Sequence, residues 1–218
     1  MFKSLSLKVI IFGFIFTFFS SFGQSFFIGL FNPSVRDDLN ISHGQFGSIY
    51  ATATLLSSFL FIWVGKKIDD INVFRFAIYV TVLLSFSCFF FSKISSIAFL
   101  FIAIFLMRFS GQGMMSHTAS TTISRYFTKS RGKALSIGWF GLSVAEFILP
   151  VTIIYLLTIY NWQNIWIFIS LLVLVFLPIA SYFLIKELNL DSRENAENNE
   201  VKNKDIKQWA RIEVIKDY

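Results

Sequence analysis

The sequence predicts an all-α membrane protein with six transmembrane helices. Hydrophobic residues make up 55% of the 218-residue chain and charged residues only 15%, whereas a soluble domain has about 25% charged residues. Six apolar segments are long enough to cross a lipid bilayer, which takes roughly 20 residues of helix. The basic residues lie in short clusters between these segments instead of along one basic face, so no nucleic-acid partner is expected.

The six spans are predicted within residues 1–185, with short connections. They are Val9–Phe31, Gln45–Val64, Phe74–Phe91, Ile94–Ile123, Ala134–Tyr155 and Ile165–Ile185. The fourth is longer than a straight crossing needs, so we expect it to be tilted or to extend beyond the bilayer. The first is too long for a signal peptide, and no small-residue cleavage pattern follows it.

The basic residues of the short loops predict the orientation. With a cytoplasmic N-terminus, nine Lys and Arg residues fall on the cytoplasmic side and two on the other side. The nine are Lys3, Lys8, Lys66, Lys67, Arg75, Arg125, Lys129, Arg131 and Lys133, and the two are Arg36 and Lys93. Cytoplasmic loops carry the excess of Lys and Arg, so we expect both termini in the cytoplasm and the spans in the cell inner (plasma) membrane.

Residues 186–218 are predicted to be a cytoplasmic linker. The first part is rich in Asn and Glu and is not expected to pack by itself. Ile206, Trp209, Ile212 and Ile215 then recur every third residue. This spacing fits a short amphipathic helix on the inner leaflet, but it equally fits a frayed chain end, and both interpretations stay open.

Arg108 and Glu146 are ionisable residues deep within predicted spans. Such residues normally face the bundle interior or an aqueous cavity, because a central arginine costs about 2.5–3.5 kcal/mol on insertion scales. Arg108 lies 17 residues before Arg125, and Glu146 lies 15 residues after Arg131. At about 1.5 Å per residue, the two charges reach similar depths, so we expect them to pair. The pair either holds two helices together permanently or opens to admit an anion or a proton.

Polar residues extend the predicted pathway around Arg108. Gln112 and Ser116 follow Arg108 at four-residue steps and share its helix face. A similar stripe in the first span consists of Thr17, Ser20, Ser21 and Gln24. These stripes either line an aqueous path or join helices by hydrogen bonds.

Small residues predict where helices approach closely. Gly47 with Ala51, and Gly141 with Ala145, have the small-xxx-small spacing that lets helix backbones touch in a membrane. Helix packing is therefore the role expected for the intramembrane glycines, Gly138 included.

The hairpin VGKKIDDINVFR, between the second and third spans, resembles the signature loop of the major facilitator superfamily. Gly65, Asp69 and Arg75 match that loop in order. Asp70 stands where the family usually has a basic residue, and Asn72 where a glycine is common.

Three further segments resemble the family in the expected order. Arg108 followed by GQG is similar to the fourth-helix arginine with its Gln/Gly cluster. RYFTKSRGKALSIGWFG is similar to the next hairpin in monocarboxylate and oxalate–formate type carriers. Gly138, Gly141 and Pro150 are similar to the fifth helix, although the compact Gly-Pro arrangement is missing.

The resemblance runs from about Lys8 to the chain end and implies the N-terminal half of a twelve-helix secondary transporter. QWARIEVIKDY resembles the segment that leads into the seventh helix. The family implies alternating access to a small solute, with Arg108 favouring an organic anion. It also implies proton coupling, a second half or homodimer as partner, and a cytoplasmic latch between Asp69 and Arg75 or Arg125. The alternative is a truncated or degenerate carrier fragment that inserts without transporting.

No enzymatic function, metal or cofactor is expected. The cytoplasmic residues show no nucleophile–base set, no metal-ligand cluster and no glycine-rich phosphate loop. Cys88 is the single cysteine and lies in an apolar run, which excludes a disulfide framework.

Overall fold

The computed structural model describes residues 4–127 and 129–186, which are helical throughout apart from short connections and contain no strand. The α-helices are α1 (Ser4–Ser20), α2 (Ser25–Leu30), α3 (Asn32–Leu39), α4 (His43–Val64), α5 (Val73–Phe91), α6 (Ile97–Met107), α7 (Ser116–Tyr126), α8 (Arg131–Leu157) and α9 (Trp162–Ile185). Two 3-10 segments, η1 (Ser21–Gly23) and η2 (Gly65–Asp69), and one π-helical segment, η3 (Arg108–Met115), connect some of them. The predicted linker and amphipathic helix lie outside the described residues, apart from Lys186.

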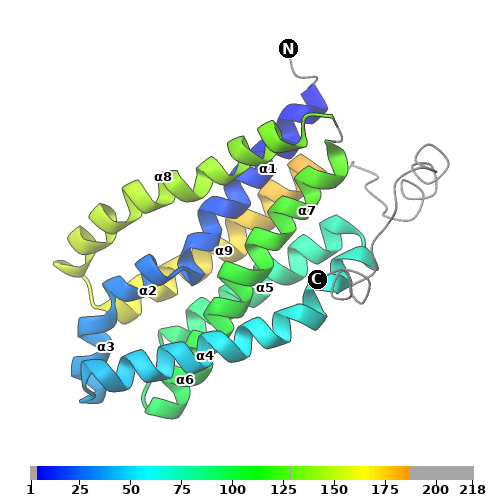
Figure 1. The fold of residues 1–218 in the computed structure, drawn as a ribbon. Coiled ribbons are helices and arrows are strands. Elements are labelled where there is room, and N and C mark those ends of the chain that lie inside the picture. The colour runs from blue at the N-terminus through cyan, green and yellow to red at the C-terminus, as the bar shows by residue number, and fades with distance from the viewer. Residues whose placement is uncertain (1–3, 128, 187–218) are drawn as a thin grey trace.

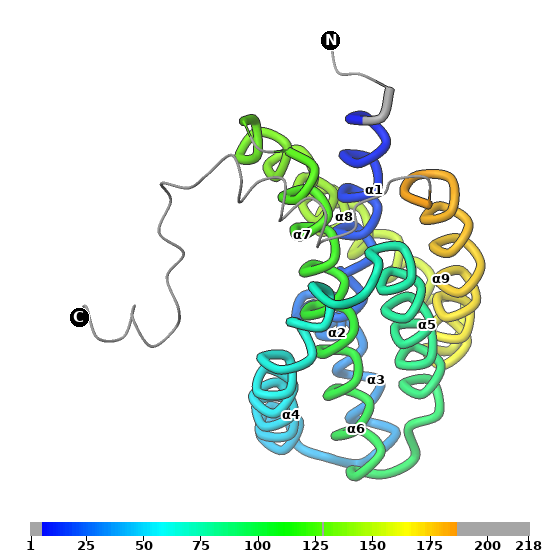
Figure 2. The backbone as a smooth tube through the Cα atoms, turned by 90° about the vertical axis from the view of Figure 1, so that its right-hand side faces the viewer, coloured from blue at the N-terminus to red at the C-terminus, as the bar shows by residue number. Residues whose placement is uncertain are grey.

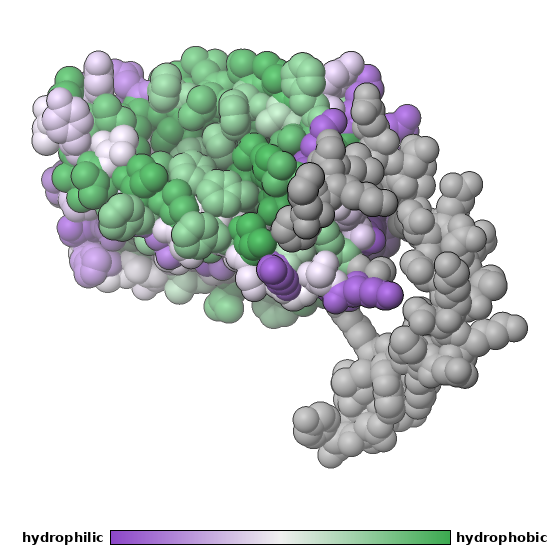
Figure 3. Space-filling model, turned by 90° about the horizontal axis from the view of Figure 1, so that it is seen from above, coloured by the Kyte–Doolittle hydropathy of each residue, from purple (hydrophilic) through white to green (hydrophobic). Residues whose placement is uncertain are grey.

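The prediction of six apolar, membrane-length helices is confirmed. The stretches that are long and apolar enough to cross a bilayer are Ser6–Gly23, His43–Asp69, Val73–Phe91, Ile97–Tyr126, Arg131–Leu157 and Trp162–Ile185. The fourth stretch joins α6, η3 and α7 into 30 residues, hereafter the fourth span. A broad apolar band covers the face drawn in Figure 3, and polar residues gather at its two ends. Such a band suits a bilayer core of about 30 Å.

The first and fourth spans occupy the middle of the bundle. α1 packs against α8 and α7, while α5 packs against α9. α8 and α4 lie at opposite edges in Figure 1, and Figure 2 shows α4 set apart from α5 and α9. Buried residues make up 61% of the apolar stretch of the first span but only 11% of that of α4 and 17% of that of α8. Two edge helices therefore leave large surfaces uncovered.

Short polar caps determine where several helices begin. Ser42 and Gln45 form a reciprocal capping box at the start of α4, and Asn72 accepts the backbone N–H groups of Phe74 and Arg75 at the start of α5. These side chains satisfy N–H groups that lack partners within the first helical turn. The caps thus separate the spans at the loops.

Close contact of α8 with α1 and α7 depends on two of the predicted packing glycines. A Cβ atom at Gly141 would overlap the carbonyl oxygen of Phe14 on α1, whereas a Cβ atom at Gly138 would overlap the side chain of Ile123 on α7. Pro150 lies half-buried within the same helix. Gly47 is different, because no atom lies within 4 Å of the position that its Cβ would take. Gly47 and its companion Ala51 are exposed, so a packing role for this pair inside the described bundle is wrong.

Thr17 joins α1 to α8 by a hydrogen bond. Its hydroxyl donates to the carbonyl oxygen of Gly138 at 2.7 Å, in a fully buried position. We expect Thr17→Val to lower the free energy of unfolding in detergent by about 1 kcal/mol, in the range measured for hydrogen bonds between membrane helices. Thr52→Val is the matched control, since that exposed hydroxyl donates to Ser48 of its own helix and to no other residue that the structure describes. Equal losses in both variants would contradict the inter-helix role.

Candidate functional site

The first span is interrupted where a continuous helix was expected. α1 ends at Ser20, η1 follows, and Gln24 is extended before α2 begins at Ser25. Serine and glycine favour such a break, because they are weak helix formers and serine can bond to nearby backbone instead. The Ser20 hydroxyl indeed donates to the carbonyl of Thr17 at 2.7 Å. The interruption leaves the carbonyl of Gly23 able to accept a bond from another helix.

Arg108 uses that carbonyl. It begins η3, and its Nη1 donates to the Gly23 oxygen at 3.0 Å and to the Ser25 hydroxyl at 3.3 Å. The guanidinium carbon lies 5.4 Å from the ring centroid of Tyr50, whose hydroxyl donates to Ser25 at 2.9 Å. Hydrogen bonds to a charged donor and a cation–π contact offset part of the desolvation cost. The side chain is only 7% exposed.

The predicted ion pair between Arg108 and Glu146 is wrong for this structure. The salt bridge found among the described residues joins Asp69 to Arg125. Glu146 lies on the exposed side of α8, whereas its neighbour Ala145 is buried. Counting residues predicts depth along a helix but not the direction that a side chain faces, and the packing of α8 on α1 turns Glu146 outward.

A pocket of about 350 Å³ lies beside Arg108, between α4, the fourth span and α8. Hydroxyl, amide and aromatic side chains line most of it. The lining residues are Thr54, Ser57, Ser58, Phe61, Arg108, Phe109, Gln112, Gly113, Ser116, His117, Ser120 and Trp139. Trp139 is held by a hydrogen bond from its indole N–H to the Ser120 hydroxyl at 3.1 Å.

Three polar atoms of this lining have no hydrogen-bond partner within the described chain. They are the Nε of Arg108 and the hydroxyl oxygens of Ser116 and Thr54. Buried polar groups are normally paired with protein, water or ligand. Residues that line the pocket therefore carry buried, unused donors around a permanent positive charge, and a carboxylate suits such a guanidinium.

The predicted pathway residues divide into two groups. Gln112 and Ser116 line the pocket with Arg108, as their shared helix face predicts. Thr17 and Ser21 are fully buried away from it, and Gln24 is half-buried outside the lining. For Thr17, the structure therefore supports the second interpretation of the first-span stripe, in which its residues join helices by hydrogen bonds.

Sequence reasoning missed several residues around the pocket. Gly23, Ser25 and Tyr50 hold the guanidinium of Arg108, and Phe61 and Trp139 form apolar walls. The SSFGQS stretch around Gly23 carried a usable signal, because clustered serine and glycine indicate a helix break. The aromatic residues carried none, since the chain has 29 phenylalanines and five tryptophans.

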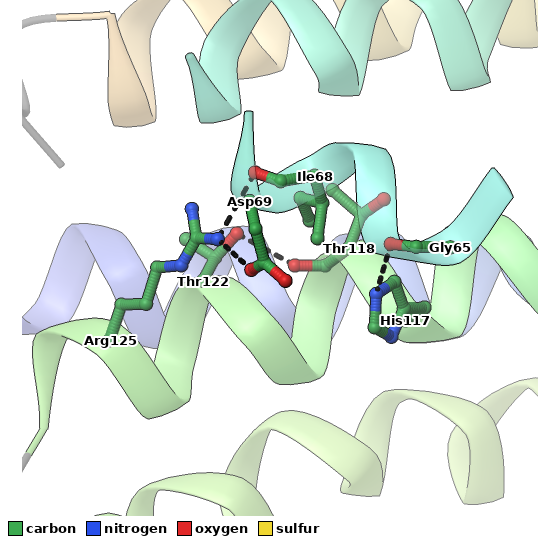
Figure 4. A network of polar contacts seen from close by, with 7 residues as sticks. All are labelled: Gly65, Ile68, Asp69, His117, Thr118, Thr122 and Arg125. Atoms are coloured by element: carbon green, nitrogen blue, oxygen red, sulfur yellow. Dashed lines mark hydrogen bonds and ion pairs between the residues drawn. The ribbon is translucent and has the colours of Figure 1, made fainter. Parts of the chain in front are cut away.

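A second polar group lies at the α4–α5 hairpin, where α7 contacts η2 (Figure 4). The Nη2 of Arg125 donates to the Asp69 carboxylate at 2.6 Å and to the carbonyl of Ile68 at 3.1 Å. Between the two basic residues predicted as partners of Asp69, the structure therefore shows Arg125. Arg75 is exposed on α5, and no ion pair involves it in the described part of the chain.

Gly65 contributes a carbonyl to the same hairpin. The Nε2 of His117 lies 3.0 Å from the Gly65 oxygen. Carbonyls at a helix C-terminus lack partners within the helix and attract basic side chains. α7 thus contacts η2 at two levels, through His117 at Gly65, which follows the end of α4, and through Arg125 at Ile68 and Asp69.

Comparison with protein families supplies the identity. The family model of the Major Facilitator Superfamily matches residues 13–216, which is nearly the whole chain. Neither the comparison with curated proteins nor that with solved structures gave a significant match. The family model does not distinguish the monocarboxylate and oxalate–formate branch. The family match and the six apolar helices together show a multi-pass membrane protein, and the chain belongs to the Major Facilitator Superfamily of membrane transporters.

Proposed function

We propose that the chain forms the N-terminal six-helix half of a secondary transporter that carries a small organic anion. The pocket at Arg108 carries this proposal. A buried, permanently charged guanidinium with an unpaired Nε lies beside unpaired hydroxyls of Ser116 and Thr54. A carboxylate suits a guanidinium because its two oxygens match the planar fork of donors. Ionisable residues inside membrane bundles commonly mark substrate pathways.

The uncovered faces of α4 and α8 support a second half. These helices flank the pocket from opposite edges of the bundle, and Gly47, Ala51 and Phe147 are exposed on them. We propose that a second six-helix unit, on another chain segment or in a second copy of this chain, covers these faces. Small residues on α4 would allow close approach, and rocking between the units would give alternating access.

The hairpin end of the bundle is proposed to face the cytoplasm of an inner (plasma) membrane, with both termini on that side. Lys66, Lys67, Arg125 and Arg131 gather at that end, in the loops for which the positive-inside bias predicts this orientation. Asp69 and Arg125 would then stabilise the conformation that is closed to the cytoplasm.

The transport proposal can be tested with the full chain in proteoliposomes. Lactate, oxalate and benzoate provide a radiolabelled panel of mono- and dicarboxylates, and choline and glucose serve as cationic and neutral comparisons. We expect uptake of at least one carboxylate and loss of that uptake in Arg108→Ala. Uptake of choline or glucose alone, or carboxylate uptake unaffected in Arg108→Ala, would contradict an anion site at Arg108. Absence of any uptake would exclude transport by copies of this chain alone.

The Asp69–Arg125 pair gives a separate prediction. We expect Asp69→Asn to slow transport several-fold while leaving membrane insertion and the thermal midpoint nearly unchanged. The Asp69 side chain is 69% exposed, and an exposed ion pair contributes about 1 kcal/mol or less to stability. Loss of the ion pair should therefore change the relative populations of the transport conformations more than the stability of the fold. Asp70→Asn is the matched control, since this neighbouring carboxylate makes no ion pair among residues 4–127 and 129–186. Equal rates in both variants and the parent chain would remove the latch role.

A further inference from the structure

His117 belongs both to the pocket and to the contact with the hairpin. It lines the pocket with Arg108 and lies directly after Ser116, whose hydroxyl is unpaired. Its Nε2 meets the Gly65 carbonyl at 3.0 Å, as Figure 4 shows. Its ring also meets the Phe61 ring edge to face, with centroids 5.4 Å apart. One imidazole therefore connects the space beside Arg108 to the end of α4.

His117 is the pocket-lining side chain whose charge can change near neutral pH. Of the lining residues, Arg108 and His117 alone are basic and none is acidic. Arginine stays protonated in proteins, whereas histidine changes charge between about pH 5 and 8. Glu146 is not part of the lining. A proton that binds inside this pocket has one side chain to bind to.

The charges around His117 relate proton binding to anion binding. From the hairpin, Lys66, Lys67 and the Asp69–Arg125 pair lie next to or beyond the Gly65 carbonyl. α8 contributes Trp139 to the pocket and no charge. Arg108 is thus the charged group that shares the pocket. A second positive charge there is opposed by Arg108 unless an anion offsets it. By linkage, an anion that favours the proton is itself favoured by the proton to the same degree.

We propose that His117 is the proton-binding residue that couples anion occupancy of the pocket to the hold of α7 on the hairpin. The anion part of this inference depends on the function proposed above, while the proton part does not. With Nε2–H already on the Gly65 carbonyl, an added proton goes to Nδ1. The bond to Gly65 then becomes charge-assisted, at a helix C-terminus where a positive charge is favourable. Proton and anion bind together, and both strengthen the α7–η2 contact.

Nuclear magnetic resonance of the full chain in lipid nanodiscs tests the proton site without a substrate. The sequence has two histidines, so 15N-histidine labelling gives two imidazole systems, and His43→Gln assigns them. We expect His117 to keep its Nε2 proton and to gain one at Nδ1 as the pH falls from about 8 to 5. An imidazole at position 117 that stays in one state over this range would overturn the proposal.

Two variants of Arg108 test the electrostatic link in the same measurement. Arg108→Gln removes the opposing charge, as a bound anion would offset it, so the titration midpoint of His117 should shift to higher pH. Arg108→Lys keeps the charge and should leave the midpoint close to that of the parent chain. Equal midpoints in Arg108→Gln and Arg108→Lys would refute the coupling, whatever the transport panel shows.

Amide hydrogen exchange of residues 65–69 tests the mechanical consequence. Dividing the exchange rate of the parent chain by the exchange rate of His117→Gln at the same pH cancels the intrinsic pH dependence of amide exchange. Glutamine can still donate to Gly65 but does not titrate. We expect this ratio to fall at least about threefold between pH 8 and 5.5, the range in which histidine gains its charge. His43→Gln is the control, because His43 is exposed at the start of α4. Its exchange rate, divided by that of His117→Gln, should fall by the same factor. A ratio independent of pH would show that His117 only packs.

Discussion

Arg108→Lys is expected to lower transport of the carried anion by about tenfold to a hundredfold while the protein remains in the membrane. The guanidinium donates to Gly23 and Ser25 through one nitrogen and still has an Nε that no described residue binds. A lysine ammonium is a compact charge without this fork, so it cannot hold the Gly23 carbonyl and an anion in the same geometry. Loss of one hydrogen bond to a charged group costs about 1.5–3 kcal/mol, and every 1.4 kcal/mol is about tenfold.

Initial uptake rates in proteoliposomes, normalised to the amount of folded protein, measure this effect. Arg36→Lys is the control for the same chemical change, since Arg36 bonds to Asn32 on α3 at the far end of the bundle. A lysine variant at position 108 that transports at the parent rate would show that only the charge matters there. The bidentate anion site would then have to be abandoned.

Gly111→Val is expected to abolish most of the folded protein. A Cβ atom at Gly111 would lie 2.7 Å from both the Cα and the nitrogen of Gly23, which is backbone and cannot move aside alone. Overpacking of this kind costs about 1–3 kcal/mol and sometimes more. Separation of η1 from η3 would also break the Arg108–Gly23 hydrogen bond, adding about 1.5–3 kcal/mol. We therefore expect a total loss of about 3 kcal/mol or more.

The measurement is the monodisperse fraction after detergent extraction, together with the unfolding midpoint. Gly47→Val and Gly29→Val are matched controls in the second span and in α2, because both glycines have open space where a Cβ would lie. Both should extract like the parent chain, provided that the second unit is absent from the preparation. Normal yield and midpoint for Gly111→Val would mean that the first and fourth spans are not as close as described.

The membrane architecture could be predicted from the sequence for a direct physical reason. Backbone groups have no water to bond to inside a bilayer, so a long apolar segment that crosses it must be a helix or part of a closed barrel. Length and hydropathy therefore predicted six apolar helical stretches of membrane length, and the described residues contain six. The hairpin motif and the order of the glycine and arginine segments predicted the family, which the family model confirms. Arg125 was one of two partners expected for Asp69, and it is the one found.

The directions that side chains face could not be predicted in the same way. Gln112 shares the pocket with Arg108 because both belong to one helix, whose period is known. The contacts predicted for Glu146 and Gly47 inside the bundle were wrong, because each prediction concerned the contact of one helix with another. Lipid is as apolar as leucine, so hydropathy does not reveal which side of a membrane helix is buried.

The sequence by itself determined the six apolar helices of membrane length and the family to which the chain belongs, and it predicted how deep each charge lies along those helices. Only the tertiary structure decided that a broken first span gives Arg108 a carbonyl partner, that Glu146 faces outward, and that His117 connects the pocket to the hairpin. Depth follows from counting residues along a helix of known rise. Rotation about the helix axis follows from close packing at glycines such as Gly23, Gly111 and Gly141, and packing involves pairs of segments that are far apart in the chain.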